Sequence, residues 1–226
     1  MCGILAIFNK QNALKFKSVA VESAHLLKHR GPDWSGIYVD DNHIMCHQRL
    51  AIVDPTSGAQ PFVSADCVLS VNGEIYNYKH LKTALKTLQP LYQYQTQSDC
   101  EVIIPLYKEY GVDCVKYLRG MFAFTLLDKG KNTYLVARDP IGIIPLYYGY
   151  GENNRDYSMW FASELKALHK WCTNVSIFPP GYVYDSNLGF SRYTLPRSIP
   201  MLKPHCIKNE LIKSSWTSFF ITASLI

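Results

Sequence analysis

The feature of this sequence that most constrains its fold is an unbroken apolar run directly behind a cysteine at the second position. Residues 3–8 read Gly-Ile-Leu-Ala-Ile-Phe, and the polar stretch Asn-Lys-Gln-Asn follows at once. A short apolar run rich in strand-forming residues is typical of a buried β-strand. The chain therefore begins with a core strand, and Cys2 stands at its start.

Cys2 has two interpretations. In the structural one, it is a small apolar residue at the start of the core strand. In the functional one, Met1 is removed, so that a nucleophilic thiol and a free α-amine share one residue. An α-amine has an ordinary pKa of about 8 and could take the thiol proton near neutral pH. If Met1 stays, the nitrogen of Cys2 is an amide without useful basicity, and this chemistry is lost.

The order of the other elements predicts an α+β fold. Apolar residues at helical spacing predict helices over 15–29, 79–88 and 102–110, the last one behind a capping box at 98–101. Asn72-Gly73 predicts a tight hairpin turn, and residues 129–132 predict a second one. Strands and helices come in clusters without regular alternation, which favours antiparallel sheets covered by helices over a parallel, doubly wound sheet. Short apolar stretches predict strands at 36–39, 44–47, 50–53, 68–71, 92–95, 121–127, 134–138, 146–150, 159–162 and 182–184.

Composition excludes several classes of protein. The 226 residues are 48% hydrophobic, and the net charge of +5 comes from scattered Lys and Arg, without the basic stripe of a nucleic-acid binder. The seven cysteines are an odd number without a Cys-x-x-Cys pair, which argues against a disulfide framework or a zinc site. The apolar stretch 216–226 is too short for a membrane span, and the first residues do not form a secretory signal. We therefore expect a cytoplasmic protein with no nucleic-acid or membrane partner.

Five polar or glycine residues could complete a site around Cys2. The amide of Asn72 and the backbone N–H of Gly73 would supply oxyanion donors, Arg49 could clamp a carboxylate, and Glu74 and Asp99 could bind an ammonium. Each has a plain alternative: a turn for Asn72-Gly73, a solvated strand residue for Arg49, and a hairpin charge or a helix-dipole partner for the two acids. Together these groups fit a zwitterionic amino acid that offers a side-chain carbonyl to a thiol. Glutamine has this form.

Many ordered motifs also carry a resemblance to a known family. With them the chain resembles the glutaminase half of glutamine-hydrolysing asparagine synthetases, over roughly residues 1–193. The motifs are Met1-Cys2-Gly3-Ile4, His29-Arg30-Gly31-Pro32-Asp33-Trp34-Ser35-Gly36, His47-Gln48-Arg49-Leu50-Ala51-Ile52-Val53-Asp54, Gly58-Ala59-Gln60-Pro61, Val71-Asn72-Gly73-Glu74-Ile75-Tyr76-Asn77, Ser98-Asp99-Cys100-Glu101, Gly120-Met121-Phe122-Ala123-Phe124, Ala137-Arg138-Asp139, Ser163-Glu164-Leu165-Lys166 and Phe178-Pro179-Pro180-Gly181.

The resemblance implies an N-terminal-nucleophile hydrolase fold, in which a four-layer αββα sandwich holds two antiparallel sheets between helices. It implies removal of Met1 and hydrolysis of L-glutamine to glutamate and ammonia through a thioester on Cys2. Asn72 and the N–H of Gly73 would form the oxyanion hole, with Glu74 and Asp99 on the α-ammonium. The carboxylate end of the glutamine would be held by Arg49 and by the backbone of Leu50, Ala51, Ile52 and Val53.

The chain also departs from this family. Residues 194–226 are expected to be the incomplete start of a synthetase domain or an aberrant end, because the Ser-Gly-Gly-Leu-Asp-Ser-type loop that binds ATP pyrophosphate does not occur. ATP and magnesium are expected only for that synthetase domain, and no cofactor for residues 1–193. The alternatives are a catalytically silent or regulatory fragment that pairs with a full-length synthetase, and another N-terminal-nucleophile amidase. A homo-oligomer also stays open.

Two further groups of residues are given structural roles. His25 and His29 stand one helical turn apart, but the zincin glutamate and a third ligand are missing, so we expect no metal site. Arg30, Asp33, Arg138 and Asp139 are expected to form a network of ion pairs and turns behind the site.

Overall fold

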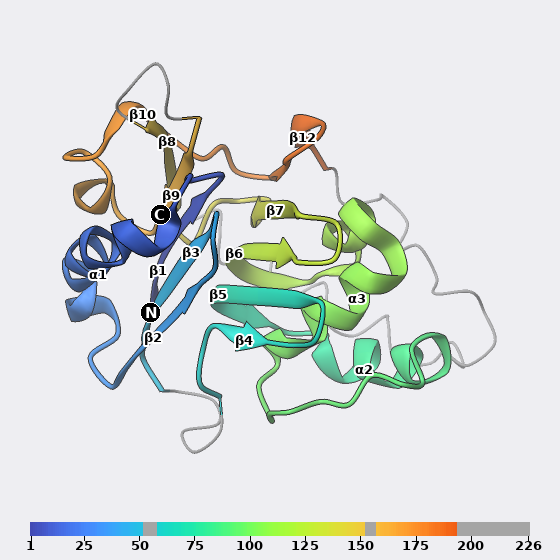
Figure 1. Cartoon of the computed structure of the whole chain (residues 1–226). Coiled ribbons are helices and arrows are strands. Elements are labelled where there is room, and N and C mark those ends of the chain that lie inside the picture. Colours follow the sequence, from blue (N-terminus) through green and yellow to red (C-terminus); the bar gives the residue numbers. More distant parts are fainter. Residues whose placement is uncertain (52–57, 152–156, 194–226) are drawn as a thin grey trace, which may run out of the picture.

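The structure is a computed structural model, and it describes residues 1–51, 58–151 and 157–193. Two antiparallel sheets of six strands each form its centre (Figure 1). The first sheet has the order β10-β8-β9-β1-β3-β2, with β1 (Gly3–Phe8), β2 (Trp34–Val39), β3 (Ile44–Arg49), β8 (Tyr147–Gly151), β9 (Met159–Ala162) and β10 (Cys172–Ile177). The second has the order β12-β11-β7-β6-β5-β4, with β4 (Phe62–Val63), β5 (Cys67–Ile75), β6 (Gly120–Asp128), β7 (Thr133–Arg138), β11 (Tyr182–Asp185) and β12 (Gly189–Arg192).

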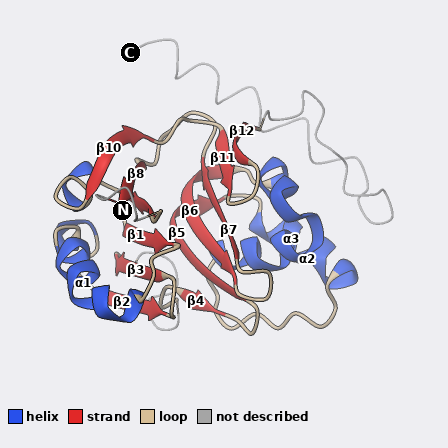
Figure 2. Cartoon of the chain, turned by 45° about the horizontal axis from the view of Figure 1, so that its top comes forward, coloured by secondary structure: helices blue, strands red, loops and turns tan. Residues whose placement is uncertain are grey.

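Helices cover the outer face of each sheet. Helix α1 (Lys17–His25) packs on the first sheet, and α2 (Tyr78–Leu88) and α3 (Ile103–Tyr110) pack on the second (Figure 2). The layers therefore follow the order αββα, which confirms the fold expected from the sequence. Short 3-10 segments complete the chain at Ala13–Phe16, Lys28–Arg30, Cys100–Val102, Gly111–Tyr117 and Leu165–Ala167.

Strand β1 is buried on both faces because the second sheet covers one face and helix α1 covers the other. Ile4, Ala6 and Phe8 face the second sheet and belong to the core between the sheets. Leu5 and Ile7 face the other way and pack in the core under α1. Successive side chains of a strand point to opposite faces, so a strand covered on both sides must be apolar throughout. This explains the unbroken apolar run at the start of the sequence.

Large aromatic side chains bind the two sheets to each other. Phe8 of β1 stacks on Tyr134 of β7, with ring centroids 4.2 Å apart and planes 8° from parallel. Phe161 of β9 lies beside both rings. Each such ring, when fully buried, contributes about 1.5–3 kcal/mol of hydrophobic stabilisation. The strand that carries Cys2 is therefore fixed against the second sheet.

The predicted hairpin turn at Asn72-Gly73 is wrong. Strand β5 continues through both residues to Ile75, and Asn72 pairs with Ala123 and Gly73 with Phe122 of β6. The glycine has a φ of 146°, which L-residues rarely adopt, but within an extended strand. A Cβ atom at this position would lie 2.1 Å from the carbonyl oxygen of Met121. Gly73 is thus needed because β5 and β6 approach each other closely here, and it does not form the turn that the Asn-Gly pair predicted.

The predicted strand at 92–95 is also wrong. Of the capping box at 98–101 only the Ser98 half forms, since the Ser98 hydroxyl accepts the N–H of Cys100 at 3.3 Å. Residues 92–95 form no strand, because the Glu101 carboxylate accepts hydrogen bonds from the backbone N–H groups of Gln95 (2.7 Å) and Thr96 (2.8 Å). The Tyr92 hydroxyl donates to the same carboxylate at 3.2 Å. Glu101 therefore organises the loop before the helix, and the N–H of Ser98 bonds to the Thr96 hydroxyl at 3.1 Å.

The strand predicted at 50–53 does not form at its described residues Leu50 and Ala51, because β3 ends at Arg49. The remaining element predictions agree with the structure apart from boundaries. The helices expected over 79–88 and 102–110 occur as α2 and α3, and the hairpin at 129–132 joins β6 to β7. The helix expected over 15–29 is shorter, with 3-10 segments on both sides of α1. Strands β4, β10 and β12 were not predicted. The expectations for residues 52–53 and 194–226 lie outside the described residues, and no helix within the described residues is long and apolar enough to cross a membrane.

Replacing Gly73 tests the close approach between β5 and β6. We expect Gly73→Ala to lower the free energy of unfolding by more than Gly111→Ala, as measured by urea denaturation. Gly111 also has a positive φ of 57°, but a Cβ atom there would meet nothing within 4 Å, so its substitution costs only backbone strain, about 1–3 kcal/mol. Equal losses in the two variants would show that β5 and β6 can separate at no cost.

Candidate active site

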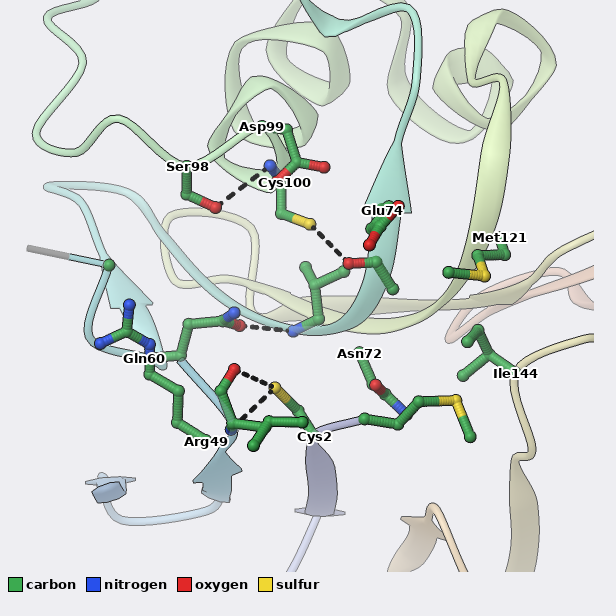
Figure 3. Close-up of a pocket in the computed structure, with 15 residues that line it drawn as sticks. Cys2, Arg49, Gln60, Asn72, Glu74, Ser98, Asp99, Cys100, Met121 and Ile144 are labelled. Carbon is green, nitrogen blue, oxygen red and sulfur yellow. Dashed lines mark hydrogen bonds between the residues drawn. The ribbon is translucent and has the colours of Figure 1, made fainter. Parts of the chain in front are cut away.

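A cavity lies at one end of the layer between the sheets, where β1, β3 and β5 meet. Cys2 precedes β1, Arg49 ends β3, and Asn72 lies on β5 of the other sheet. In Figure 3, Cys2 lies below the cavity, Asn72 to one side, Arg49 and Gln60 to the other, and Glu74, Ser98 and Asp99 above. The complete lining is Met1, Cys2, Arg49, Leu50, Gly58, Gln60, Val71, Asn72, Gly73, Glu74, Ser98, Asp99, Cys100, Met121 and Ile144.

The thiol of Cys2 is held by the backbone of one residue. The N–H of Leu50 donates a hydrogen bond to Sγ at 3.3 Å. The thiol in turn donates to the carbonyl oxygen of Leu50, with Sγ and the oxygen 3.7 Å apart (Figure 3). Burial raises the pKa of the Cys2 thiol, and the Leu50 N–H, the N-terminal ammonium, Arg49 and Arg30 oppose this in smaller measure. The thiol is therefore protonated at neutral pH and requires a base before it can attack.

The main chain of Cys2 is anchored from behind. Arg30 donates from Nε to the Cys2 carbonyl oxygen at 2.9 Å and from its terminal nitrogen to Glu164 at 3.0 Å. Two residues further on, the N–H of Ile4 donates to the Ser163 hydroxyl at 2.9 Å. These contacts tie the first residues to the segment after β9, so the position of the thiol does not depend on β1 alone.

Asn72 and Gly73 present donors to the cavity. The side-chain nitrogen of Asn72 is buried and has no hydrogen-bond partner among the residues that the structure describes. An unpaired buried donor costs about 1–3 kcal/mol, so it calls for a partner that the folded chain itself does not supply. Gly73 follows it on β5 and also lines the cavity. Both line the same cavity as Cys2, and their role as an oxyanion hole stays a prediction.

The two predicted ammonium ligands reach the cavity from different elements. Glu74 extends from β5, and Asp99 precedes the 3-10 segment Cys100–Val102. One carboxylate oxygen of Asp99 accepts the backbone N–H of Ile75 at 2.6 Å, and the thiol of Cys100 donates to the Gly73 carbonyl oxygen at 3.5 Å. The segment around Asp99 is therefore bonded to the very stretch of β5 that carries Gly73 and Glu74.

The residues predicted to hold a carboxylate are only partly brought together. Arg49 and Leu50 line the cavity. Ala51 is not among the lining residues, and its N–H donates to the Asp33 carboxylate at 2.8 Å. Ile52 and Val53 lie outside the described residues. The roles of all five stay predictions.

The four residues expected to form a network behind the site bond to other groups: Arg30 pairs with Glu164, Asp33 accepts the N–H of Ala51, and Arg138 and Asp139 make turn contacts. The Asp139 carboxylate accepts the N–H groups of Ile141, Gly142, Ile143 and Ile144 at 2.7–3.1 Å. Arg138 donates to the carbonyl oxygens of Ile144, Phe178 and Gly142. This holds Ile144 in place at the wall of the cavity.

Several lining residues escaped sequence reasoning. Gln60, Cys100 and Met121 lie within motifs recognised in the sequence and Ile144 lies outside them, but nothing in their spacing indicates that they meet at Cys2. The helix-capping contact predicted for Ser98 is present, but the prediction gave no sign that this residue also lines the cavity. The place of these residues in the cavity follows from contacts between residues far apart in the chain, for which the sequence offers no local signal.

A buried histidine lies in the same inter-sheet layer. His47 of β3 hydrogen-bonds through Nδ1 to the Ser70 hydroxyl of β5 at 2.8 Å. Burial, with a smaller effect of the Arg49 charge, lowers the pKa of His47 to about 3. The ring is therefore neutral and links the sheets without adding charge near Arg49. Within the described part of the chain no group of three His, Cys, Asp or Glu side chains could hold a metal ion. Of the two histidines considered as metal ligands, His29 bonds instead to the Glu164 carboxylate at 2.8 Å.

Together, the αββα sandwich and a cysteine directly before one of its buried strands agree with the architecture expected for a glutamine amidotransferase. Residues 1–185 match the family model described as glutamine amidotransferase domain. The chain belongs to this family.

Relatives named as glutamine-hydrolysing asparagine synthetases are similar over most of the chain. One from Zea mays is 50% identical over 192 residues, which are 84% of this chain and 32% of the relative. A probable one from Schizosaccharomyces pombe is 50% identical over 189 residues, which are 82% of this chain and 33% of the relative. The chain thus spans about a third of the length of these relatives.

Solved structures support the fold. A glutamine phosphoribosylpyrophosphate amidotransferase from B. subtilis matches with a TM-score of 0.63 at 20% identity, covering 88% of this chain and 50% of that chain. A structure described as the allosteric regulatory enzyme of purine biosynthesis matches with a TM-score of 0.67 at 22% identity and the same coverage. At these identities the likeness concerns the architecture.

The anchor behind Cys2 predicts a loss of stability in acid. Partial burial alone would raise the pKa of Glu164, but hydrogen bonds from Arg30, Lys166 and His29 lower it from an ordinary 4.5 to about 2. A carboxyl group with a lowered pKa in the folded state stabilises above its unfolded pKa, and this stability is lost as pH falls from 4.5 to 2. We expect the melting temperature of the parent to fall more steeply over this window than that of Glu164→Gln.

Glu22→Gln serves as the matched control. Glu22 makes an exposed ion pair with Lys170 at 2.8 Å, of a kind that contributes little to stability. Its pH dependence should follow that of the parent. If the melting temperatures of all three proteins fall by the same amount between pH 4.5 and pH 2, the anchoring role of Glu164 is contradicted.

Proposed function

We propose that this chain is a glutaminase of the asparagine-synthetase type, which hydrolyses L-glutamine to glutamate and ammonia. One observation carries the proposal. The thiol of Cys2 and the unpaired, buried side-chain nitrogen of Asn72, from two different sheets, line the same cavity. A nucleophile opposite an unused donor is the arrangement that amide hydrolysis needs.

The chemistry depends on removal of Met1. The free α-amine of Cys2 then takes the Sγ proton, and the thiolate forms a bond to the side-chain carbonyl carbon of glutamine. Asn72 and the N–H of Gly73 stabilise the negative oxygen. When this intermediate collapses, the carbon–nitrogen bond breaks, and the protonated amine gives its proton to the departing nitrogen, which leaves as ammonia. Water, deprotonated by the same amine, cleaves the thioester to glutamate, and Sγ regains its proton.

The charges of the cavity suit the amino-acid end of the substrate. Arg49 is the cationic side chain that would bind the α-carboxylate, and Glu74 and Asp99 would bind the α-ammonium. Opposite charges at the two ends of one cavity fix the orientation of a zwitterion, so that its side chain points toward Cys2. In this proposal the hydrolysis requires no cofactor.

We further propose that the ammonia serves asparagine formation. The support is that relatives with about 50% identity carry the name asparagine synthetase. In this proposal ATP and magnesium act only in a synthetase domain, which would activate the acceptor. The proposed compartment is the cytoplasm, in keeping with the free cysteines at 2, 46, 67, 100, 114 and 172.

Substituting the nucleophile tests the enzyme directly. Cys2→Ala should release no glutamate from L-glutamine above the uncatalysed rate, because no thioester can form. Cys172→Ala, at another partly buried cysteine on β10, should keep the activity of the parent. Mass spectrometry of the parent should show a chain without Met1. A parent that retains Met1, releases no glutamate and binds a full-length synthetase would support the regulatory alternative instead.

The oxyanion donor has its own prediction. Removing one such donor typically lowers kcat about 10²–10³-fold, because the developing negative charge loses a preorganised hydrogen bond. We therefore expect Asn72→Ala to lower kcat by this factor with little change in KM, as measured by glutamate release. A rise in KM at constant kcat would assign Asn72 to substrate binding.

A further inference from the structure

A polar side chain on the cavity wall is left without a role in the proposed chemistry. Gln60 is 8% exposed and lies opposite Asn72 in Figure 3. Its side-chain oxygen accepts the backbone N–H of Val71 at 2.7 Å. Val71 is the residue directly before Asn72 on β5, so the amide is fixed to the strand that carries the oxyanion donors.

This hydrogen bond determines which way the amide is turned. The backbone N–H of Val71 is a donor, so the oxygen of the Gln60 amide must face it and the NH2 group must point away. Two N–H donors are therefore left on the side of the cavity. Because the cavity wall is largely buried, these donors gain most from a charged acceptor.

The backbone around Gln60 is also held in place. Gly36 of β2 lies against it, and a Cβ atom on this glycine would come within 2.0 Å of the Gln60 carbonyl oxygen. The absence of a side chain at Gly36 thus lets the loop that carries Gln60 sit directly on the first sheet. The first sheet therefore holds the main chain of Gln60, and the second sheet holds its side-chain oxygen. Such preorganisation is expected of a binding group.

The charges in the cavity identify the acceptor. Glu74 and Asp99 are acceptors themselves and suit the α-ammonium, while the side-chain carbonyl of glutamine is directed at Cys2 and Asn72. The remaining acceptor of the substrate is its α-carboxylate, and Arg49 lies on the same side of the cavity as Gln60 in Figure 3. We propose that Gln60 is a substrate-binding and specificity-determining residue, whose NH2 group donates to the α-carboxylate of glutamine beside Arg49. This inference rests on the proposed function.

The variant Gln60→Glu tests it with little change of shape. One oxygen of the new side chain can still accept the Val71 N–H, but the other replaces the NH2 donor by a negative charge. A hydrogen bond to a charged group is worth roughly 10- to 100-fold in affinity, so KM for L-glutamine should rise by at least about 10-fold while kcat changes less than about 3-fold. The measurement is glutamate release at pH 8, where the new carboxyl is ionised.

A matched control and a second substrate separate binding from damage. Gln48→Glu makes the same change at a buried glutamine whose oxygen accepts the Ser35 hydroxyl at 2.6 Å but which does not line the cavity. Its KM should stay within about twofold of the parent. L-Glutamine α-amide has a neutral carboxamide in place of the carboxylate. The factor by which Gln60→Glu lowers kcat/KM should therefore be at least about 10 times smaller for this substrate than for L-glutamine.

The outcomes distinguish this inference from the proposed function. Equal losses on both substrates, or an unchanged KM for L-glutamine, would overturn the role of Gln60 and leave the glutaminase intact. If the parent hydrolyses nothing, calorimetric titration with L-glutamate still decides. Weaker binding to Gln60→Glu than to the parent supports the contact, and equal binding overturns it. A parent that neither hydrolyses L-glutamine nor binds L-glutamate overturns both proposals.

Discussion

The face-to-face packing of the two sheets is the constraint on which the rest of the structure depends. Cys2 directly precedes β1 of the first sheet and Arg49 ends β3 of the same sheet, while Asn72, Gly73 and Glu74 belong to the second. They form one cavity only because the apolar faces of the sheets, with the stack of Phe8 on Tyr134 at their centre, are buried against each other. The hydrophobic core therefore sets the distance across the site, and packed cores of this kind resist deformation.

The edge of β5 shows how the site is kept rigid without a further strand. Beyond the short strand β4, the backbone of β5 bonds to side chains: Gln60 accepts the N–H of Val71, Cys100 donates to the carbonyl of Gly73, and Asp99 accepts the N–H of Ile75. A partner strand would have filled the cavity with its own backbone. Side chains satisfy the same backbone groups and leave room beside Gly73, so an open sheet edge becomes a binding wall.

Local patterns predicted the elements well where one face or both faces are buried. Strand β9 was predicted at its observed boundaries, and α2 and α3 were each predicted to within one residue. Buried faces require apolar residues at regular spacing, and this spacing is visible in the sequence. Asn72-Gly73 failed because nine pairs of residues join β5 to β6, and this ladder outweighs the turn preference of two residues. The strand at 92–95 failed because the Glu101 carboxylate binds the backbone N–H groups at the end of this segment, those of Gln95 and Thr96.

The sequence by itself determined the class of fold, the family and the residues around which a site would form. It did so because buried strands, glycines and reactive side chains each leave a local signature, and because the motifs occur in the family's order. Only the tertiary structure decided that Asn72 and Gly73 lie within a strand, that Ala51 is bonded to Asp33, and that Gln60 faces the cavity. These facts depend on contacts between residues far apart in the chain, and no local pattern of side chains encodes the partner of a backbone N–H.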